Sequence, residues 1–180
     1  SLNLDRAKRL IEIAGTKAKL GGWRMSLGAT HVSWTPQTAA IHEAPFEPAP
    51  SAEEAFLYYL PAYRQKIEQC YRQCISKGKS FDEVLQIKTR KNRIIWVRAI
   101  GEPERDSQGK IIGAQGAFQD VTEFMHEKTR NSDLEQKMLG TLENMSDAFY
   151  IVSPQFDFVY LNLRAEKLLK RQREELLGKN

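Results

Sequence analysis

Two cysteines and three histidines are the side chains of this 180-residue sequence best suited to bind a metal. Cys70 and Cys74 are four residues apart, so on a helix their thiols share one face. Two thiolates without further ligands make a poor zinc site. His31 and His42 could ligate a metal only if the fold brought them together. We therefore interpret the histidines as surface or packing residues and the cysteines as small core residues of a reducing compartment.

The sequence contains no motif that predicts catalysis. It has no glycine-rich phosphate loop, no nucleophile with a partnered base and no carboxylate pair at a defined spacing. The densest charge cluster, residues 88–93, falls where a hairpin turn is expected and has no interleaved aromatic residues. We interpret it as a solvated loop, and predict neither a nucleic-acid partner nor catalysis by this segment.

A polar motif at residues 120–123 falls where a strand gives way to a helix. Asp120 can cap the helix, and Glu123 is three residues later, where it can reach back in a capping box. One interpretation is a plain helix cap. The other is that the cap also transmits movement of the sheet to the helix. Both interpretations stay open, and under the second we assign Asp120, Thr122 and Glu123 to signal coupling.

Hydrophobic periodicity predicts the elements that would position these residues. Three- and four-residue spacing predicts helices over 2–14, 37–44, 52–60 and 121–145, and a long helix that carries Tyr63 and Ile67 and is ended by Gly78. Alternation predicts strands over 23–27, 31–35, 81–89, 94–102 and 111–120. This order predicts an α+β fold, with one five-stranded antiparallel sheet, helices on one face and a C-terminal linker helix.

The chain divides into four predicted segments: an N-terminal amphipathic helix (1–14), a main domain (15–123), a helical linker (124–145) and a partial repeat of the main domain (146–180). The repeat is too short to close a sheet, so we expect residues 147–180 to be poorly ordered or held by another chain. The mostly polar stretch 126–133 weakens a coiled-coil interpretation of the linker. No apolar run of the sequence is long enough to span a bilayer. We expect the chain to be a piece of a larger protein.

Several motifs resemble those of the PAS family, including its C-terminal PAC motif. They are Trp-Val-Arg at 96–98, DSQGKIIG at 106–113 and GAFQDVTE at 116–123, with a looser match in Gly-Gly-Trp at 21–23 and Ser-Trp-Thr at 33–35. A second, truncated copy is similar at DAFYIV (147–152), VYLN (159–162) and EELLG (174–178). The resemblance implies a sensor fold that binds a small molecule or another PAS domain and passes strain to a flanking helix.

Strand alternation suggests which side chains would face a pocket. If Trp96 and Arg98 point outward, Val97 and Ala99 point inward, together with one side of the neighbouring strand. The candidates, completed by two residues of the long helix, are Ile67, Tyr71, Val97, Ala99, Ala114, Gly116 and Phe118. The same residues would also form an ordinary filled core, which is the simpler interpretation.

The resemblance supports neither flavin nor haem, so the cofactor stays unknown. Flavin-binding members carry a cysteine in an N-C-R-F-L motif and polar residues on the inner strands, whereas Cys70 lies in EQCYR and the strand positions are Val97 and Phe118. Haem-binding members often supply a histidine from the long helix, and residues 61–77 contain none.

We therefore expect a cytoplasmic sensory module that signals through its linker helix to an output domain. The resemblance favours a sensor histidine kinase of a two-component system, and any membrane anchor of the parent is expected outside this segment. The alternatives are a diguanylate cyclase or phosphodiesterase, or a ligand-free protein-interaction domain. A homodimer through the PAS domain and linker helices is the expected assembly, with a small-molecule ligand as a possible partner.

Overall fold

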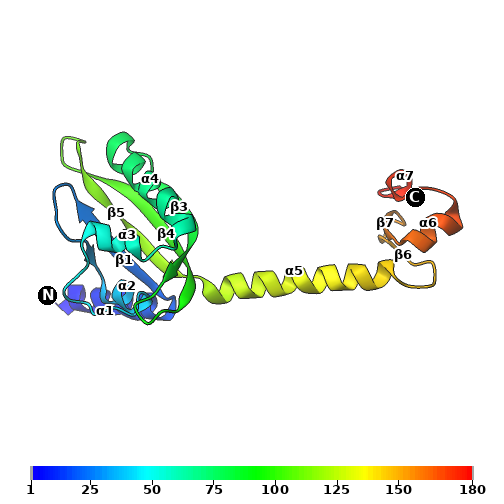
Figure 1. The fold of residues 1–180 in the computed structure, drawn as a ribbon, viewed down its shortest axis with the longest axis horizontal. Helices are drawn as coiled ribbons and strands as arrows, with labels where there is room; N and C mark the ends of the chain where they lie inside the picture. The colour runs from blue at the N-terminus through cyan, green and yellow to red at the C-terminus, as the bar shows by residue number, and fades with distance from the viewer. Residues whose placement is uncertain (1, 180) are drawn as a thin grey trace. The chain divides into compact units, whose positions relative to one another are not determined.

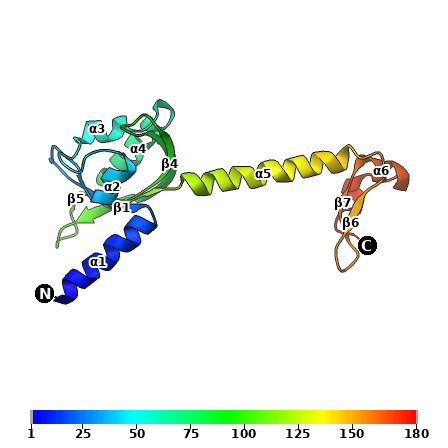
Figure 2. The same cartoon turned by 90° about the horizontal axis from the view of Figure 1, so that it is seen from below.

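The computed structural model of the chain describes residues 2–179, which form two compact units. The first unit ends at Met125 and the second begins at His126. Figures 1 and 2 show the elements of both units from two directions. Residues 1 and 180, the outer ends of the first and last predicted segments, lie outside the described residues. The division into four segments stays a prediction.

The first unit contains one helix, two strands, three helices and three strands, in that order. They are α1 (Leu2–Lys17), β1 (Leu20–Ser26), β2 (Ser33–Trp34), α2 (Pro36–Ile41), α3 (Ala52–Leu57), α4 (Pro61–Lys77), β3 (Phe81–Lys88), β4 (Ile94–Arg105) and β5 (Ile111–Asp120). Local signals set the helix ends. Ser51 and Glu54 form a capping box at the start of α3, and Gly78 ends α4 in the left-handed conformation.

The five strands form one antiparallel sheet in the order β2-β1-β5-β4-β3. In the β4–β5 pair, Val97 lies opposite Asp120 and Ala99 opposite Phe118. Figure 2 shows α2, α3 and α4 on one side of this sheet. The predicted α+β class and the antiparallel adjacency of the strands within residues 94–120 are therefore confirmed.

Several element ends differ from the prediction. β4 runs past Glu102 to Arg105, because the chain beyond Glu102 still pairs with β5. α1 continues through Gly15, since one glycine costs a helix only about 1 kcal/mol. The second strand is limited to Ser33–Trp34, because the residues before it pair with a distant loop rather than with β1.

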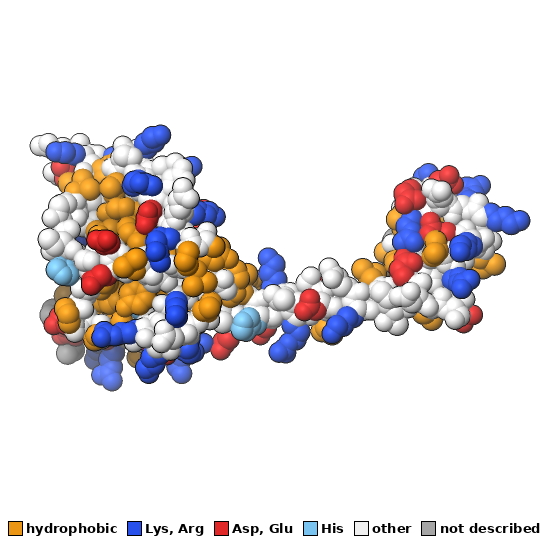
Figure 3. All heavy atoms as spheres, in the orientation of Figure 1, with side chains coloured by type: hydrophobic (Ala, Val, Ile, Leu, Met, Phe, Trp, Pro, Cys, Tyr) orange, Lys and Arg blue, Asp and Glu red, His pale blue; other side chains and the backbone are white. Residues whose placement is uncertain are grey.

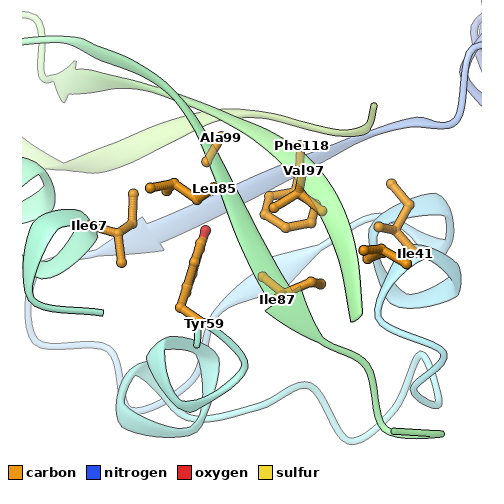
Figure 4. Packing of buried hydrophobic residues seen from close by; sticks show 9 residues of the cluster. Ile41, Tyr59, Ile67, Leu85, Ile87, Val97, Ala99 and Phe118 are labelled. Atoms are coloured by element: carbon orange, nitrogen blue, oxygen red, sulfur yellow. The ribbon is translucent and has the colours of Figure 1, made fainter. Parts of the chain in front are cut away.

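The core of the first unit lies between the sheet and helices α2 to α4. Leu85, Ile87 and Val97 on the neighbouring strands β3 and β4 are completely buried. Figure 4 shows their packing, and the whole cluster contains Ile41, Tyr59, Ile67, Leu85, Ile87, Ile95, Val97, Ala99 and Phe118. Because full burial of one large apolar side chain contributes about 1.5–3 kcal/mol, this cluster is the main source of stability for the unit.

Apolar side chains also reach the surface. Figure 3 shows them over much of the visible face of the first unit, interspersed with charged residues. α1 is exposed along nearly its whole length, and its Leu10 and Ile11 side chains are 68% and 72% exposed. Among the described residues, no helix combines the length and the apolar character needed to cross a bilayer.

The second unit contains most of α5 and a small hairpin with two helices. α5 (Thr122–Glu143) begins in the first unit, and β6 (Tyr150–Val152), β7 (Phe158–Leu161), α6 (Leu163–Leu169) and α7 (Arg173–Leu176) follow it. β6 and β7 pair antiparallel. Leu161, Asn162 and Ala165 are at most 1% exposed, so the segment has a core of its own. The described residues of 147–180 therefore pack into a compact unit, contrary to the expectation of poor order. That another chain holds this segment stays a prediction.

A buried asparagine explains this order. The Asn162 side-chain oxygen accepts hydrogen bonds from the backbone N–H groups of Phe149 and Ala165, both at 2.9 Å. Its Nδ2 donates to the carbonyl oxygens of Leu142 and Asp147, at 2.9 and 3.0 Å. One side chain therefore joins the end of α5, the hairpin and α6, which compensates for the strands that a complete domain would have.

An arginine of α7 links the end of α5 to α6 by charge. Arg173 Nη1 donates to Glu143 Oε1 at 2.7 Å, and Arg173 Nη2 donates to Glu166 Oε2 at 2.8 Å. These hydrogen bonds lower the pKa of both carboxyl groups. The three side chains are one third exposed or less, so solvent screens these ion pairs less than it screens pairs on an open surface.

Candidate functional site

A cavity of about 70 Å³ lies in the core of the first unit. It is lined by Trp23, Met25, Val32, Trp34, Thr38, His42, Ala55, Phe56, Tyr59, Ile67, Tyr71, Phe81, Ala99 and Phe118. More than half of these side chains carry a ring, and none is an Asp, Glu, Lys or Arg. The cavity is therefore apolar with a few polar groups, which is the usual composition of a small-molecule pocket.

The structure brings four of the predicted pocket residues to this cavity: Ile67, Tyr71, Ala99 and Phe118. Val97 and Ala114 are completely buried but do not belong to the lining. Arg98 is exposed between Val97 and Ala99, as the predicted alternation requires.

Gly116 does not line the cavity, contrary to the prediction. A Cβ atom at this position would collide with the backbone of Ile100 and Gly101 on β4. The two strands approach so closely here that no side chain can extend from position 116. Gly116 borders instead a shallow hollow that also includes Trp23 and Trp34.

His42 is a lining residue that the sequence analysis assigned only to the surface or to packing. It directly follows α2, and its ring is buried. Its ring centroid is 4.7 Å from those of Phe118 and Tyr58 and 5.1 Å from that of Trp34. His42 Nδ1 is 2.8 Å from the carbonyl oxygen of Thr38, so Nδ1 is the protonated nitrogen. Burial lowers the pKa of His42 to about 4, and the imidazole is neutral at pH 7.

Tyr59 provides an unpartnered polar group at the cavity. It is only 7% exposed, and its hydroxyl makes no hydrogen bond with any residue of the described range 2–179. Figure 4 shows the hydroxyl pointing toward the sheet. Burial raises the pKa of Tyr59, so the group keeps its proton and can donate. The nearby Thr38 hydroxyl, by contrast, already donates to the Gly22 carbonyl oxygen at 2.8 Å.

The cysteines pack as predicted. Cys74 is completely buried and Cys70 packs against the core cluster, both as free thiols. Burial raises the pKa of each thiol. His31 is exposed and bonds to Thr30, away from the buried His42. Within the described part of the chain, no group of three or more His, Cys, Asp and Glu residues could hold a metal ion.

A second candidate site lies where β5 ends and α5 begins. Asp120 Oδ1 accepts hydrogen bonds from Thr122 N at 2.9 Å and from Thr122 Oγ1 at 2.6 Å. Thr122 Oγ1 accepts in turn from Trp96 N at 3.0 Å, and Val121 N donates to Trp96 O at 2.9 Å. The first turn of α5 is thus tied to the backbone of β4, directly beside Val97 in the core.

The predicted capping box between Asp120 and Glu123 is not formed. The Asp120 N–H group, which Glu123 would have to satisfy, already donates to the carbonyl oxygen of Lys19. Glu123 instead forms an exposed ion pair with Lys19 at 3.1 Å. Asp120 and Thr122 therefore make the junction, while Glu123 pairs with Lys19 in the segment that leads into β1.

Two family models match the chain. One, described as "PAS fold", matches residues 32–118, and another, described as "PAS domain", matches residues 146–180. The chain belongs to the PAS family. The first match includes all the cavity-lining residues except Trp23 and Met25, and the second confirms a partial second PAS domain. This PAS chain is therefore a sensory module of the kind found in signalling proteins.

A curated relative of this PAS chain is a probable diguanylate cyclase, DgcE, of Escherichia coli (strain K12). The two are 23% identical over 168 residues, which is 93% of this chain. The chain spans only 15% of the length of that relative.

Solved PAS structures share the fold. A sensory box histidine kinase/response regulator from Burkholderia thailandensis E264 has a TM-score of 0.57 at 16% identity, covering 71% of this chain and 96% of the other. The N-terminal domain of a diguanylate cyclase with PAS/PAC sensor from Marinobacter aquaeolei has a TM-score of 0.55 at 17% identity, covering 59% and 99%. At this identity the likeness is one of fold.

Proposed function

We propose that the chain is the input part of a signalling protein. In this proposal the state of the first PAS core sets the position of α5, and α5 controls a downstream output domain. A small ligand in the cavity, or a partner PAS domain, supplies the signal. Either can shift the equilibrium between two states of the core only by binding one state more tightly than the other.

The observation that carries this proposal is the bonding between Trp96 and Thr122. Trp96 belongs to β4, whose next residue, Val97, is part of the buried core cluster. Its backbone N–H donates to Thr122 Oγ1, and its carbonyl oxygen accepts from Val121 N. A shift of β4 must therefore move the first turn of α5 or break these bonds. The predicted coupling role of Asp120 and Thr122 rests on this geometry, and that of Glu123 rests only on its exposed pair with Lys19.

Two output classes are candidates. A histidine kinase is the class expected from the sequence resemblance. A diguanylate cyclase is favoured by the curated relative, because that match extends over both units of this chain. In either case the parent is proposed to act in the cytoplasm.

An interaction module is the remaining alternative. In that case the cavity stays empty of any ligand, and the proposed homodimer itself transmits the signal. A ligand that raises the melting temperature of the chain would favour sensing over this alternative, because binding to the folded state alone stabilises it.

The coupling is tested in the full-length protein with Thr122→Val. This change keeps the shape of the side chain and removes the hydroxyl that bonds Asp120 and Trp96. We expect the output activity to change several-fold and to lose its response to the input. Formation of cyclic di-GMP from GTP and autophosphorylation by ATP measure the two candidate outputs.

Thr141→Val is the matched control. Thr141 lies on α5 as well, is exposed, and bonds only within the helix, to the carbonyl oxygen of Lys137 at 2.9 Å. It should leave the output unchanged. If both variants signal like the wild type, the junction does not couple the core to α5 and the proposal is wrong.

A further inference from the structure

We infer that the cavity of the first unit takes a small uncharged molecule that carries one hydrogen-bond acceptor. The inference rests on the proposed function, since it names the class of ligand for the proposed sensing cavity. It is drawn from three properties of the lining: its charge, the unpartnered hydroxyl of Tyr59 and its volume.

The charge of the lining excludes ions. None of the lining side chains is acidic or basic at pH 7, because the only titratable nitrogen base among them, His42, is buried and neutral. Its Nδ1 is already committed to the Thr38 carbonyl oxygen. An ion placed here would lose its hydration and find no opposite charge, which is far more costly than burying a neutral group.

The Tyr59 hydroxyl provides the polar contact. A hydroxyl that faces an apolar cavity is unfavourable until a group in the cavity accepts its proton, since most polar groups inside proteins are hydrogen-bonded. Among the described residues none accepts the Tyr59 proton, and the Thr38 hydroxyl and the His42 Nδ1 direct their own protons to Gly22 and to Thr38. A ligand oxygen or nitrogen with a free lone pair can accept the Tyr59 proton and satisfy the group.

The volume limits the size of the ligand. The cavity measures about 70 Å³. An apolar protein cavity of about 150 Å³ binds benzene, with its six heavy atoms, so about three non-hydrogen atoms fit here without rearrangement. Short nitriles, alcohols and aldehydes have this size, are uncharged and carry one acceptor atom.

Three probes of matched size test the inference on the chain of residues 1–180. Acetonitrile is neutral and has one acceptor, formate has the same number of heavy atoms and a negative charge, and xenon is neutral without an acceptor. We expect acetonitrile and xenon to shift the NMR signals of Ala99, Ile67 and Phe118 saturably, and formate to leave them unchanged. Ala99→Val, which fills the cavity, should weaken the binding of both acetonitrile and xenon.

Tyr59→Phe removes only the hydroxyl. It should lower the affinity for acetonitrile about three- to tenfold, which is the effect of one neutral hydrogen bond, and leave the affinity for xenon unchanged. The inference is overturned if formate binds as tightly as acetonitrile. It is also overturned if the NMR shifts caused by acetonitrile do not saturate, or if Tyr59→Phe leaves the affinity for acetonitrile unchanged. A parallel loss of affinity for acetonitrile and xenon in this variant would overturn it as well.

These outcomes are separate from the test of the proposed function. Binding is measured without an output domain, so a failure here leaves the result for Thr122→Val standing. Conversely, a junction that does not couple to the output would leave the affinity of the cavity for acetonitrile unaffected.

Discussion

His42 shows how one buried side chain sets conditions for the whole core. Its ring fills space between Phe118, Tyr58 and Trp34, and within the described residues the ring bonds only to the Thr38 carbonyl oxygen. Protonation would place a charge among aromatic rings with no carboxylate in contact. The fold therefore excludes the proton, and burial lowers the pKa from its ordinary value of 6.5 to about 4.

This makes the stability of the first unit depend on pH. The unfolded chain takes up a proton on His42 near pH 6.5, while the folded chain resists it until about pH 4. Protons therefore favour unfolding as the pH falls from 6.5 to 4, and the contribution is complete above 6.5. We expect His42 to account for a loss of roughly 3 kcal/mol over this range, measured by urea unfolding with tryptophan fluorescence.

His42→Phe should remove that part of the pH dependence, because the ring stays and the titrating nitrogen goes. His31→Gln, which alters an exposed histidine of the same unit, should keep the pH dependence of the wild type. Equal slopes of stability against pH in the wild type and His42→Phe would show that the buried imidazole does not resist protonation.

Some cavity residues are predictable from the sequence and others are not, for a physical reason. Ala99 and Phe118 lie in strands, where alternation fixes which side chains point inward. His42 and Tyr59 lie just past the ends of α2 and α3, which stop short of the helices predicted over 37–44 and 52–60, so the helical period does not fix the direction of their side chains. Gly116 obeys the alternation, but the close approach of β4 leaves it without a path to the cavity.

At the scale of elements, both ends of α5 are fixed by side chains outside the helix. Asp120 holds its first turn, and Asn162 and Arg173 hold its last. The strands and helices themselves were predictable, because their hydrophobic period is local. The Asn162 contacts were not, since they join groups up to 20 residues apart in a segment that lacks the rest of its sheet.

Asn162→Ala should therefore disorder the second unit. The change leaves the N–H groups of Phe149 and Ala165 and two carbonyl oxygens without their partner, and each buried unsatisfied group costs about 1–3 kcal/mol. We expect the hydrogen-exchange protection of the β6–β7 amides, measured by NMR, to fall about a hundredfold or more.

Asn144→Ala provides the comparison. Asn144 is an exposed residue of the same region whose side chain bonds only to the Gly140 carbonyl oxygen. It should leave the protection of the hairpin nearly unchanged. Similar protection in both variants would mean that the hairpin is held by apolar contacts and that Asn162 contributes little.

At the scale of the whole molecule, the chain has two cores of unequal strength. The first unit buries a large cluster around Val97, whereas the second buries little more than Leu161, Asn162 and Ala165. All three tryptophans, Trp23, Trp34 and Trp96, belong to the first unit. Tryptophan fluorescence therefore reports on the first unit alone, which keeps the His42 and Asn162 experiments independent of each other.

The proposed homodimer makes a prediction at this scale. Leu134 and Met138 are 58% and 62% exposed, and they lie four residues apart on α5, where they share one face of the helix. Burying such side chains against a second copy of the chain would contribute about 1.5–3 kcal/mol each.

The double variant Leu134→Lys, Met138→Lys should therefore raise the dissociation constant of the dimer at least tenfold in sedimentation equilibrium. Lys137→Gln, a change between these two residues that removes a charge, should alter it little. A chain that stays monomeric at every concentration, or a dimer indifferent to the double variant, would exclude this face of α5 as the contact.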